Sequence, residues 1–498
     1  MEYIMRRTFI LVGIAFLAFV PASLTAQSAQ DATAIQAVRA VADAVDKFDP
    51  NQFVQILIQR FGPRLTGSDS EHKSAAWALD EMRRAGLSDV HTETWTLHRG
   101  WKRLHAAARL TKPYETKLEV ASYGWSGSTH GGVSGEVVLV DGNATLTKEA
   151  VRNWRGKIVL VAPISKDGIR GVADAPVLAN WAEKAHAVAV IDGITRPGGM
   201  LHTGPIGFPG RESSVPILDM PEMQRQQLEH LVKQGAKPKV SLDIANRFTD
   251  GPISVENVIG EIEGAVHPEQ VVLVGAHLDS WDLSPGATDD GTGVAAVIAA
   301  ARAIHASGVL PDRTIRFVLF TGEEQGLLGS QAYVEQHRAE LSHFVCALVM
   351  DWGAGPITRF PLAGHPELEG PLTSLFQAEA FKSIKTSSGF LTFTDGFAFT
   401  FAGLPGIGLL QDSPDYDRDA HSTEDSLGAV NAPALRFNTR VLASSAIWLA
   451  DVKQRPGSAF TQAENEQALR PVRSALARII RETPARVVLA DELVARRF

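Results

Sequence analysis

The sequence predicts an α/β fold with a mostly parallel sheet in its main domain and a small β-rich domain inserted into it. Two observations predict this. In the second half of the chain, short unbroken runs of β-branched and aromatic residues alternate with helical patterns, which is typical of parallel strands buried on both faces. From about residue 110 to residue 250, glycine and proline become frequent and the apolar runs become shorter, which indicates a separate unit.

Length and composition describe a globular protein. The chain has 498 residues, which is too long for one simple domain and long enough for a large buried core. Its net charge is −8, and no basic patch with interleaved aromatic residues appears, which argues against nucleic acid as a partner. Cys346 is the only cysteine, so an internal disulfide and a cysteine-based metal site are both excluded.

Residues 1–26 have the pattern of a cleaved signal peptide. Two arginines, Arg6 and Arg7, precede an apolar core from Phe9 to Val20, and small residues lead to a cleavage point after Ala26. The apolar core is too short to span a bilayer, which favours cleavage over the alternative of an uncleaved anchor. We therefore expect an exported protein, periplasmic or secreted, without a stable membrane anchor. The arginine pair also partly matches a twin-arginine signal, but the short leading segment favours the general secretory route.

Residues 27–109 contain helices and the start of the main domain. Apolar residues at helical spacing predict one helix from Asp31 to Arg60 and a second, amphipathic helix from Glu71 to Ala85. The R-L-T-G-S sequence that begins at Arg64 lies between them and predicts a turn.

Residues 110–250 predict the small inserted domain. Its short strand patterns are Val137–Val140, Lys157–Ala162 and Val188–Ile191, with a helical pattern at Val177–His186. Three histidines, His130, His186 and His202, fall in this segment without an acidic partner at ligand spacing. We expect them to be surface or locally bonded side chains and not metal ligands.

The segment from Val271 to Gly293 carries the strongest functional signal. Its first residues, up to Ala276, predict a buried strand that ends in His277 and Asp279, and these two lie on one side of an extended chain. A turn rich in proline and glycine then leads through Asp289 to an alanine-rich helical pattern. Taken singly, a core histidine and helix-capping aspartates would explain these residues equally well.

The next two strand patterns end in acidic residues as well. Thr314–Phe320 leads into Glu323 and Glu324, and Phe344–Met350 leads into Asp351. Because the carboxyl ends of parallel strands meet at the edge where open α/β sheets bind ligands, we expect these side chains to converge. Several like charges at one place repel each other unless a cation holds them, so the pattern predicts a metal site.

A second histidine, His421, follows in the polar loop from Asp412 to Asp425. Two imidazoles and several carboxylates without a thiolate fit zinc, with manganese and cobalt as alternatives.

Four of these sequence features resemble peptidase family M28, the co-catalytic dizinc aminopeptidases. They are G-A-H-L-D-S-W-D, G-A-T-D-D-G, T-G-E-E-Q-G and the late histidine, and the first and third are most similar to the carboxypeptidase Q (plasma glutamate carboxypeptidase) branch. The likeness covers about Val54 to Lys453. It implies a zinc-exopeptidase domain at residues 251–457, an inserted domain of the protease-associated type and two zinc ions per chain.

The resemblance also implies roles for individual residues. It assigns five metal ligands: His277, Asp289, Glu324, Asp351 and His421. Asp289 would bridge the two zinc ions, Glu323 would be the general base, and Asp279 would orient His277. The carboxypeptidase Q branch has a second acid two residues away at the third strand end, whereas Asp351 stands there alone in this sequence.

The expected activity is hydrolysis of the N-terminal peptide bond of short unblocked peptides, dipeptides included, by a metal-bridging hydroxide with Glu323 as the base. Asp395 is a candidate contact for a substrate amino group, with a helix cap as the alternative. Tyr416 is a candidate oxyanion contact or a filler of its loop, and Trp281 and Trp352 are candidate walls of the substrate site. Relatives of the carboxypeptidase Q branch pair as homodimers, so we expect a dimer.

Three alternatives remain open on the same fold. They are hydrolysis of a non-peptide amide, a glutaminyl-cyclase-like reaction at a single zinc, and an inactive receptor-like binding module. A binding module has no use for the general base Glu323, which argues against the last. The sequence has no G-x-S-x-G, Walker A, H-E-x-x-H or C-x-x-C motif, which argues against the other common hydrolase and nucleotide-dependent classes. Residues 458–498 predict a helical extension without an assigned function.

Overall fold

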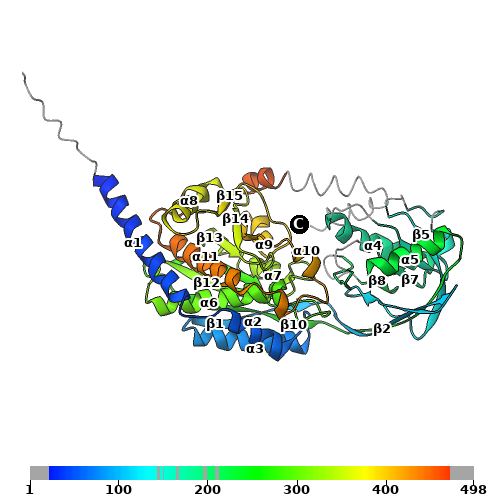
Figure 1. Ribbon diagram of the computed structural model, residues 1–498. Coiled ribbons are helices and arrows are strands. Elements are labelled where there is room, and N and C mark those ends of the chain that lie inside the picture. Colours follow the sequence, from blue (N-terminus) through cyan, green and yellow to red (C-terminus); the bar gives the residue numbers. More distant parts are fainter. Residues whose placement is uncertain are drawn as a thin grey trace, which may run out of the picture.

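The computed structural model describes residues 22–142, 146–149, 151–163, 168–193, 199–207 and 212–470. The predicted signal peptide lies outside the described residues apart from its last five positions, which begin helix α1. The described chain forms two lobes side by side (Figure 1). None of the helices in the described ranges combines the length and the apolarity that crossing a membrane would require.

The larger lobe is built on a six-stranded sheet in the order β1-β10-β12-β11-β13-β16. Its strands are β1 Ser88–Leu97, β10 Ile253–Ile262, β12 Arg313–Phe320, β11 His267–His277, β13 Phe344–Val349 and β16 Gly406–Gly408. The last four in this order run parallel, and β1 and β10 form an antiparallel edge. The predicted α/β class with a mostly parallel sheet is therefore confirmed.

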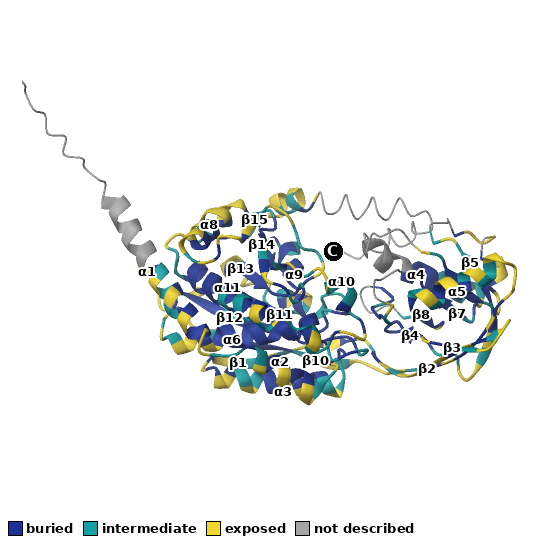
Figure 2. Ribbon diagram, in the orientation of Figure 1, coloured by how far each residue is buried: buried dark blue, intermediate teal, exposed yellow. Residues whose placement is uncertain are grey.

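Helices cover both faces of this sheet, and the alternation along β11 shows why. Val272 and Val274 face a core formed with α6 and α11, while Val271 and Leu273 face a second core with α7 and α9. Figure 2 shows the sheet as a buried layer between helices whose outer sides are exposed. The helices of this lobe are α1 Ala22–Val45, α2 Asn51–Phe61, α3 Asp69–Arg84, α6 Thr292–Ser307, α7 Leu328–Gln336, α8 Glu369–Ala378, α9 Gly396–Phe401, α10 Tyr416–Asp419 and α11 Ala432–Asp451.

The prediction of a single helix from Asp31 to Arg60 is wrong, because one helix ends at Val45 and a second helix begins at Asn51. Pro50 stands at the start of the second helix. Proline lacks the backbone N–H that a helix interior needs, and it disfavours helical geometry in the residue before it. Both helices pack against α6, and α1 also packs against α11.

The smaller lobe contains an eight-stranded sheet in the order β3-β2-β9-β5-β6-β7-β8-β4. Its strands are β3 Thr116–Leu118, β2 Gly100–Lys112, β9 Lys239–Thr249, β5 Val133–Val140, β6 Ile158–Val161, β7 Ala189–Ile191, β8 Ile217–Asp219 and β4 Ala121–Ser122, and its helices are α4 Gly168–Ala185 and α5 Glu222–Lys233. Strands β2 and β9 pair with each other. In the sequence, β2 directly follows β1 of the larger sheet, and β9 directly precedes β10 of the larger sheet. They carry the chain from one lobe to the other and back (Figure 1).

Two further parts complete the larger lobe. A small sheet joins β15 Lys385–Ser387, β14 Ile357–Pro361 and β17 Leu410–Gln411. The predicted C-terminal extension is described as far as residue 470, and residues 462–470 are helical. It is attached through Phe460, whose ring stacks on His365 at 3.7 Å, and through Asn465, whose amide donates to the carbonyl of Phe401 at 2.8 Å.

Arg313 joins the start of β12 to the end of α11. Its side chain is buried, and its guanidinium donates to Gln270 Oε1 at 2.7 Å and to the carbonyl oxygens of Ala450 and Val452 at 2.9 and 2.7 Å. The last carbonyls of a helix have no partner within the helix, so a buried cation there satisfies them and favours the helix dipole.

We expect Arg313→Met to lower the free energy of unfolding by about 2 to 4 kcal/mol, because it leaves buried carbonyl oxygens without donors. The comparison is Arg359→Met, which removes an exposed arginine from β14 and should change stability by about 0.5 kcal/mol or less. Urea unfolding of both variants measures this difference. Equal unfolding midpoints would show that Arg313 contributes no more than a surface arginine.

Candidate metal centre

Three neighbouring parallel strands bring the predicted site residues to one edge of the larger sheet. In the register of the sheet, His277 at the end of β11 stands opposite Phe320 at the end of β12, and Gly275 stands opposite Val349 at the end of β13. Glu323 and Glu324 follow β12, and Asp351 follows β13. The apolar runs that form these strands therefore place each polar side chain at the point where its strand ends.

Asp289 lies between the two predicted histidines. Its Oδ1 is 3.1 Å from His277 Nε2, and its Oδ2 is 3.1 Å from His421 Nε2. On the first side, Asp351 Oδ1 is 3.5 Å from His277 Nε2, and on the second, Glu324 Oε2 is 3.0 Å from His421 Nε2. The structure thus forms two groups, each with one imidazole and one carboxylate of its own, that share Asp289.

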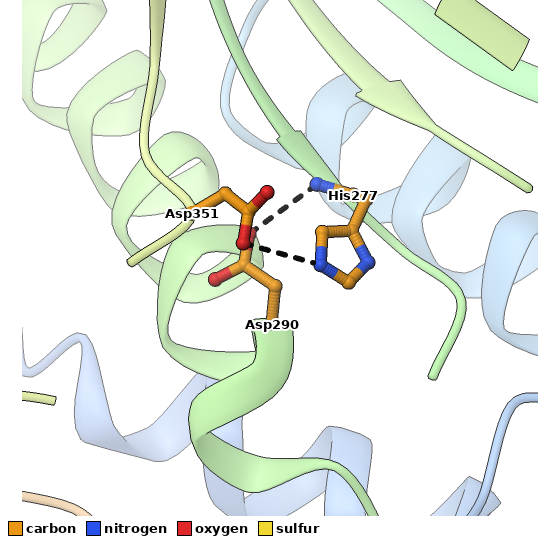
Figure 3. A group of neighbouring side chains, drawn as sticks. All are labelled: His277, Asp290 and Asp351. Atoms are coloured by element: carbon orange, nitrogen blue, oxygen red, sulfur yellow. Dashed lines mark hydrogen bonds and ion pairs between the residues drawn. The ribbon is translucent and has the colours of Figure 1, made fainter. Parts of the chain in front are cut away.

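Asp290 also points into the first group. Its carboxylate lies with the imidazole of His277 and the carboxylate of Asp351 in a cluster whose possible ligand atoms are all within 4.8 Å of one another (Figure 3). Both Asp290 oxygens already accept backbone hydrogen bonds, from the N–H of His277 at 3.3 Å and from that of Gly293 at 3.0 Å. A Cβ atom at position 293 would lie 2.2 Å from this carboxylate, so only glycine fits there. Asp290 therefore holds the loop backbone, whereas the two oxygens of Asp289 face the two imidazoles.

Burial and the two histidines determine the electrostatics of the centre. Burial raises the pKa of Glu324 to about 7 and that of Asp351 to about 6. For His421, burial works in the opposite direction, but Glu324 and Asp289 outweigh it and raise the pKa of the imidazole to about 10. The two histidines place positive charge beside these carboxylates.

The residues present fit two divalent cations. Glu324 Oε1 and Asp351 Oδ2 are buried and accept no hydrogen bond. Such orphaned acceptors are costly unless a ligand satisfies them, and each lies in a different one of the two groups. Imidazole and carboxylate donors without thiolates are the ligands of zinc in catalytic sites. One cation per group would give every one of these atoms a partner.

Asp279 orients two other residues of the centre. The Nδ1 atom of His277 lies 3.0 Å from the carbonyl oxygen of Asp279, which leaves Nε2 directed at Asp289. The Asp279 carboxylate accepts from the backbone N–H of Glu323 at 3.3 Å and from the hydroxyl of Thr66 at 2.6 Å. Thr66 in turn accepts from the side-chain amide of Gln325 at 3.0 Å. A buried chain of hydrogen bonds therefore links the N-terminal segment to both strand ends.

Arg64 fixes the loop between His277 and Asp289. Its guanidinium is fully buried and donates to the carbonyl oxygens of Leu278, Pro285 and Gly286 at 2.7, 2.7 and 3.0 Å. Burial lowers its pKa to about 10, although four nearby aspartates oppose this shift. A cation bonded to the loop backbone in this way holds the turn that carries Asp289 and adds positive charge behind it.

Asp425 holds the other side of the same turn. Its carboxylate accepts from the backbone N–H and the hydroxyl of Thr288 at 2.6 and 2.7 Å and from the backbone N–H of Asp289 at 3.2 Å. Asp425 belongs to the loop of His421, so this carboxylate ties the shared ligand to the loop of the second histidine.

The remaining predicted residues surround the two groups. Glu323 is partly exposed, whereas Glu324 is buried, and burial together with Asp351 raises the pKa of Glu323 well above its usual value. Asp395 precedes α9 but makes no capping bond. It is fully buried, and burial raises the pKa of its carboxyl to about 8, although the hydroxyl of Ser330 opposes this shift. The alternative of a capping aspartate is thus not supported by its contacts.

The aromatic residues predicted near the site lie on two sides of it. The ring of Trp281 is 6.1 Å from that of His421, and the ring of Trp352 is 6.0 Å from that of Tyr416. Trp281 is buried and Trp352 is half-buried. Burial and the neighbouring aspartate Asp289 raise the pKa of Tyr416 well above its usual value.

The supporting roles of Arg64, Thr66, Asp290 and Asp425 were not predicted from the sequence. The R-L-T-G-S sequence was a signal for a turn only, because nothing in its own pattern shows what it contacts. Asp290 is adjacent to the predicted ligand Asp289, and Asp425 lies four residues after the predicted ligand His421. This proximity in sequence was the one available signal that they support the site.

Comparison with known proteins agrees with this geometry. Residues 257–446 match the model of peptidase family M28. Carboxypeptidase Q of Mus musculus is 28% identical over 411 residues, which are 80% of this chain and 85% of that protein. The solved structure of a peptidase M28 precursor from Shewanella amazonensis superposes with a TM-score of 0.73 at 27% identity, covering 87% of this chain and 99% of that one.

A zinc aminopeptidase from Bacillus subtilis has the same fold, with a TM-score of 0.63 and 21% identity over 83% of this chain and 97% of that one. The sequence likeness extends through both lobes, and the matched model spans the three strand ends and the loop of His421. Residues 257–446 therefore match peptidase family M28, and the chain is similar to carboxypeptidase Q over most of its length.

Proposed function

We propose that this chain is an exported dizinc metallo-exopeptidase that removes the N-terminal residue from short unblocked peptides, dipeptides included. The observation that carries this proposal is the position of Asp289 between two imidazoles, with an orphaned carboxylate oxygen in each of the two groups. The fold shared with a zinc aminopeptidase and the likeness to carboxypeptidase Q support zinc and peptide substrates.

Five residues would hold the metals: His277 and Asp351 on one side, His421 and Glu324 on the other, and Asp289 between them. Two divalent cations, when bound, lower the pKa of water and polarise a carbonyl oxygen. The protein's contribution would be to hold these five side chains in place, with Asp279 orienting His277 and Arg64 fixing the turn that carries Asp289.

Glu323 is the residue that moves the proton. It follows Gly322 at the end of β12, its backbone is bonded to Asp279, and its side chain is partly exposed, so water and substrate can reach it. Its carboxylate would take a proton from the attacking water and donate it to the amine of the leaving residue. Glu324 points the other way, toward His421, and is suited to binding a cation.

Asp395 would select substrates with a free N-terminus. A buried carboxylate with a raised pKa is costly to ionise, and the ammonium group of an unblocked peptide offers the opposite charge and the hydrogen bonds that would stabilise it. Turnover of dipeptides with free and acetylated N-termini tests this proposal. We expect hydrolysis of the free series only, and equal rates for the acetylated series would contradict an aminopeptidase.

Removal of the metals should abolish activity and lower the thermal unfolding midpoint. Without cations the centre contains buried acids with raised pKa values, and binding to the native state alone stabilises it by mass action. Exhaustive chelation followed by a thermal scan and an activity assay measures both effects, and added zinc should restore them. Full turnover by metal-free protein would sink the dinuclear proposal.

The adjacent glutamates should respond differently to the same substitution. Glu323→Gln keeps the shape of the side chain and removes its basicity, so it should retain both metals while losing at least ~100-fold in kcat. Glu324→Gln replaces a charged ligand with a weak neutral one, so it should lose one metal along with activity. Metal content and rate are needed for each variant. If Glu323→Gln lost a metal and Glu324→Gln kept both, the two roles would be reversed.

Thr66→Val should reduce kcat or metal affinity by about 10- to 100-fold, the usual effect of removing a residue that orients a metal ligand or its support. The variant keeps the side-chain volume and removes only the hydroxyl that bonds Asp279. Thr314→Val is the matched control. It removes a buried hydroxyl with two bonds, to Pro268 and Gly264, on the opposite end of β12. Equal turnover in the two variants would show that Thr66 has only a structural role.

A further inference from the structure

We propose that the smaller lobe is a working part of the metal centre: Arg103 and the segment from Leu201 to Gly204 are positioning elements that hold His421 against Asp289 and Glu324. The inference rests on the proposed function, in which His421 binds a cation. It goes beyond that function because it assigns the integrity of one metal site to residues of the lobe that contributes no ligand.

The first observation is a backbone clamp around His421. The N–H of Thr203 donates to the carbonyl oxygen of His421 at 2.9 Å, and the N–H of Thr423 donates to that of Leu201 at 3.1 Å. Between these bonds, His202 and Ser422 stand opposite each other in an antiparallel bridge. The carbonyl of His421 and the N–H of Thr423 are therefore bonded to the smaller lobe, while the N–H groups of Ala420 and Ser422 are bonded to Tyr416 and Asp419 within the larger lobe.

The second observation is the backbone conformation that this clamp holds. His421 has φ of +58°, in the left-handed region that a residue with a Cβ atom enters at a cost of about 1 kcal/mol or more. Such a conformation persists only where surrounding contacts fix it. The two bonds of the clamp supply those contacts.

The clamp is itself anchored in the smaller sheet. His202 is buried, its backbone N–H donates to Asp219 of β8 at 2.7 Å, and its Nε2 lies 3.0 Å from the carbonyl oxygen of Arg418 at the end of α10. The N–H of Gly124 donates to the carbonyl of Gly204 at 2.9 Å. Figure 1 shows α10 on the side of the larger lobe that faces the smaller one.

Arg103 links this segment to the loop of the other histidine. On β2 of the smaller lobe, its guanidinium contacts both oxygens of Asp282, at 2.8 and 3.1 Å, and also donates to Thr203 Oγ1 at 3.0 Å. The side chains of Arg103 and Asp282 are only 13% and 18% exposed, and a two-bond arginine–carboxylate pair fixes orientation as well as distance. Asp282 follows His277 by five residues, so one side chain of the smaller lobe contacts both histidine-bearing regions.

Trp281 contacts both His421 and the smaller lobe. Its ring lies edge-on to His421 at 6.1 Å and packs so closely on Gly124 that a Cβ atom there would be 2.3 Å from the ring. The imidazole is therefore bounded by an aromatic ring that both lobes hold in place.

We expect a weaker clamp to affect only one of the two proposed cation sites. The group of Asp289, Glu324 and His421 depends on the clamp, whereas the group of His277 and Asp351 is held by strand ends of the larger sheet. Weakening the contact between the lobes should therefore loosen one cation and leave the other.

Arg103→Gln tests this, with Arg109→Gln as the matched control, since Arg109 lies on the same strand and pairs only loosely, at 3.8 Å, with the exposed Glu115. The zinc-loaded full-length proteins are dialysed against graded concentrations of a chelator, and zinc per chain is measured by elemental analysis. We expect Arg103→Gln to release one of its two zinc ions at least ~10-fold more readily than the wild type and the control. The other ion should be retained as in the wild type.

A double variant identifies which ion is lost. Arg103→Gln combined with Glu324→Gln should bind no less zinc than Glu324→Gln alone, because both changes act on the same site. Thr203→Val, which removes only the hydroxyl that meets Arg103, gives a second test in the same direction if Arg103→Gln fails to fold. Unchanged release from the single variants, or loss of both ions together, would overturn the inference. A wild type that binds no zinc would instead overturn the proposed function on which it rests.

Discussion

The structure depends on one unfavourable arrangement, the burial of several carboxylates around Asp289. Unpaired buried acids cost several kcal/mol each, and the raised pKa values of Glu324 and Asp351 reflect that cost. The two imidazoles offset part of it, and the orphaned oxygens of the same two acids remain for cations. Under the proposed function, folding and metal binding would be coupled at this point, since bound cations would compensate the remaining carboxylate charge.

Holding such a cluster requires support from segments that are far apart in the chain. Arg64 fixes the carbonyls of the loop before Asp289, Asp425 accepts the N–H groups of the turn itself, and Thr66 bonds the carboxylate that orients His277. Each of these contacts joins residues separated by more than a hundred positions. The rigidity of the centre therefore comes from the tertiary fold, and the strands supply the direction of each ligand.

The two lobes have unequal parts in this arrangement. All five proposed ligands belong to the larger lobe, and three of them follow from the ends of β11, β12 and β13. His421 differs, because it lies in a loop after α10 and keeps a left-handed backbone conformation. Its neighbours in the smaller lobe make the bonds that a strand would otherwise provide. This division explains how a domain without ligands can still matter to the metal centre.

The sequence by itself determined the class of fold and the candidate ligands. Buried parallel strands appear as unbroken β-branched runs, and polar residues at their ends are visible because the pattern changes abruptly there. It misjudged the first helix, since the break at Pro50 interrupts an apolar pattern that otherwise continues. It did not show the roles of Arg64, Thr66, Asp290 or the clamp on His421. Those depend on which distant backbone groups lie within hydrogen-bond reach, and only the tertiary structure decides that.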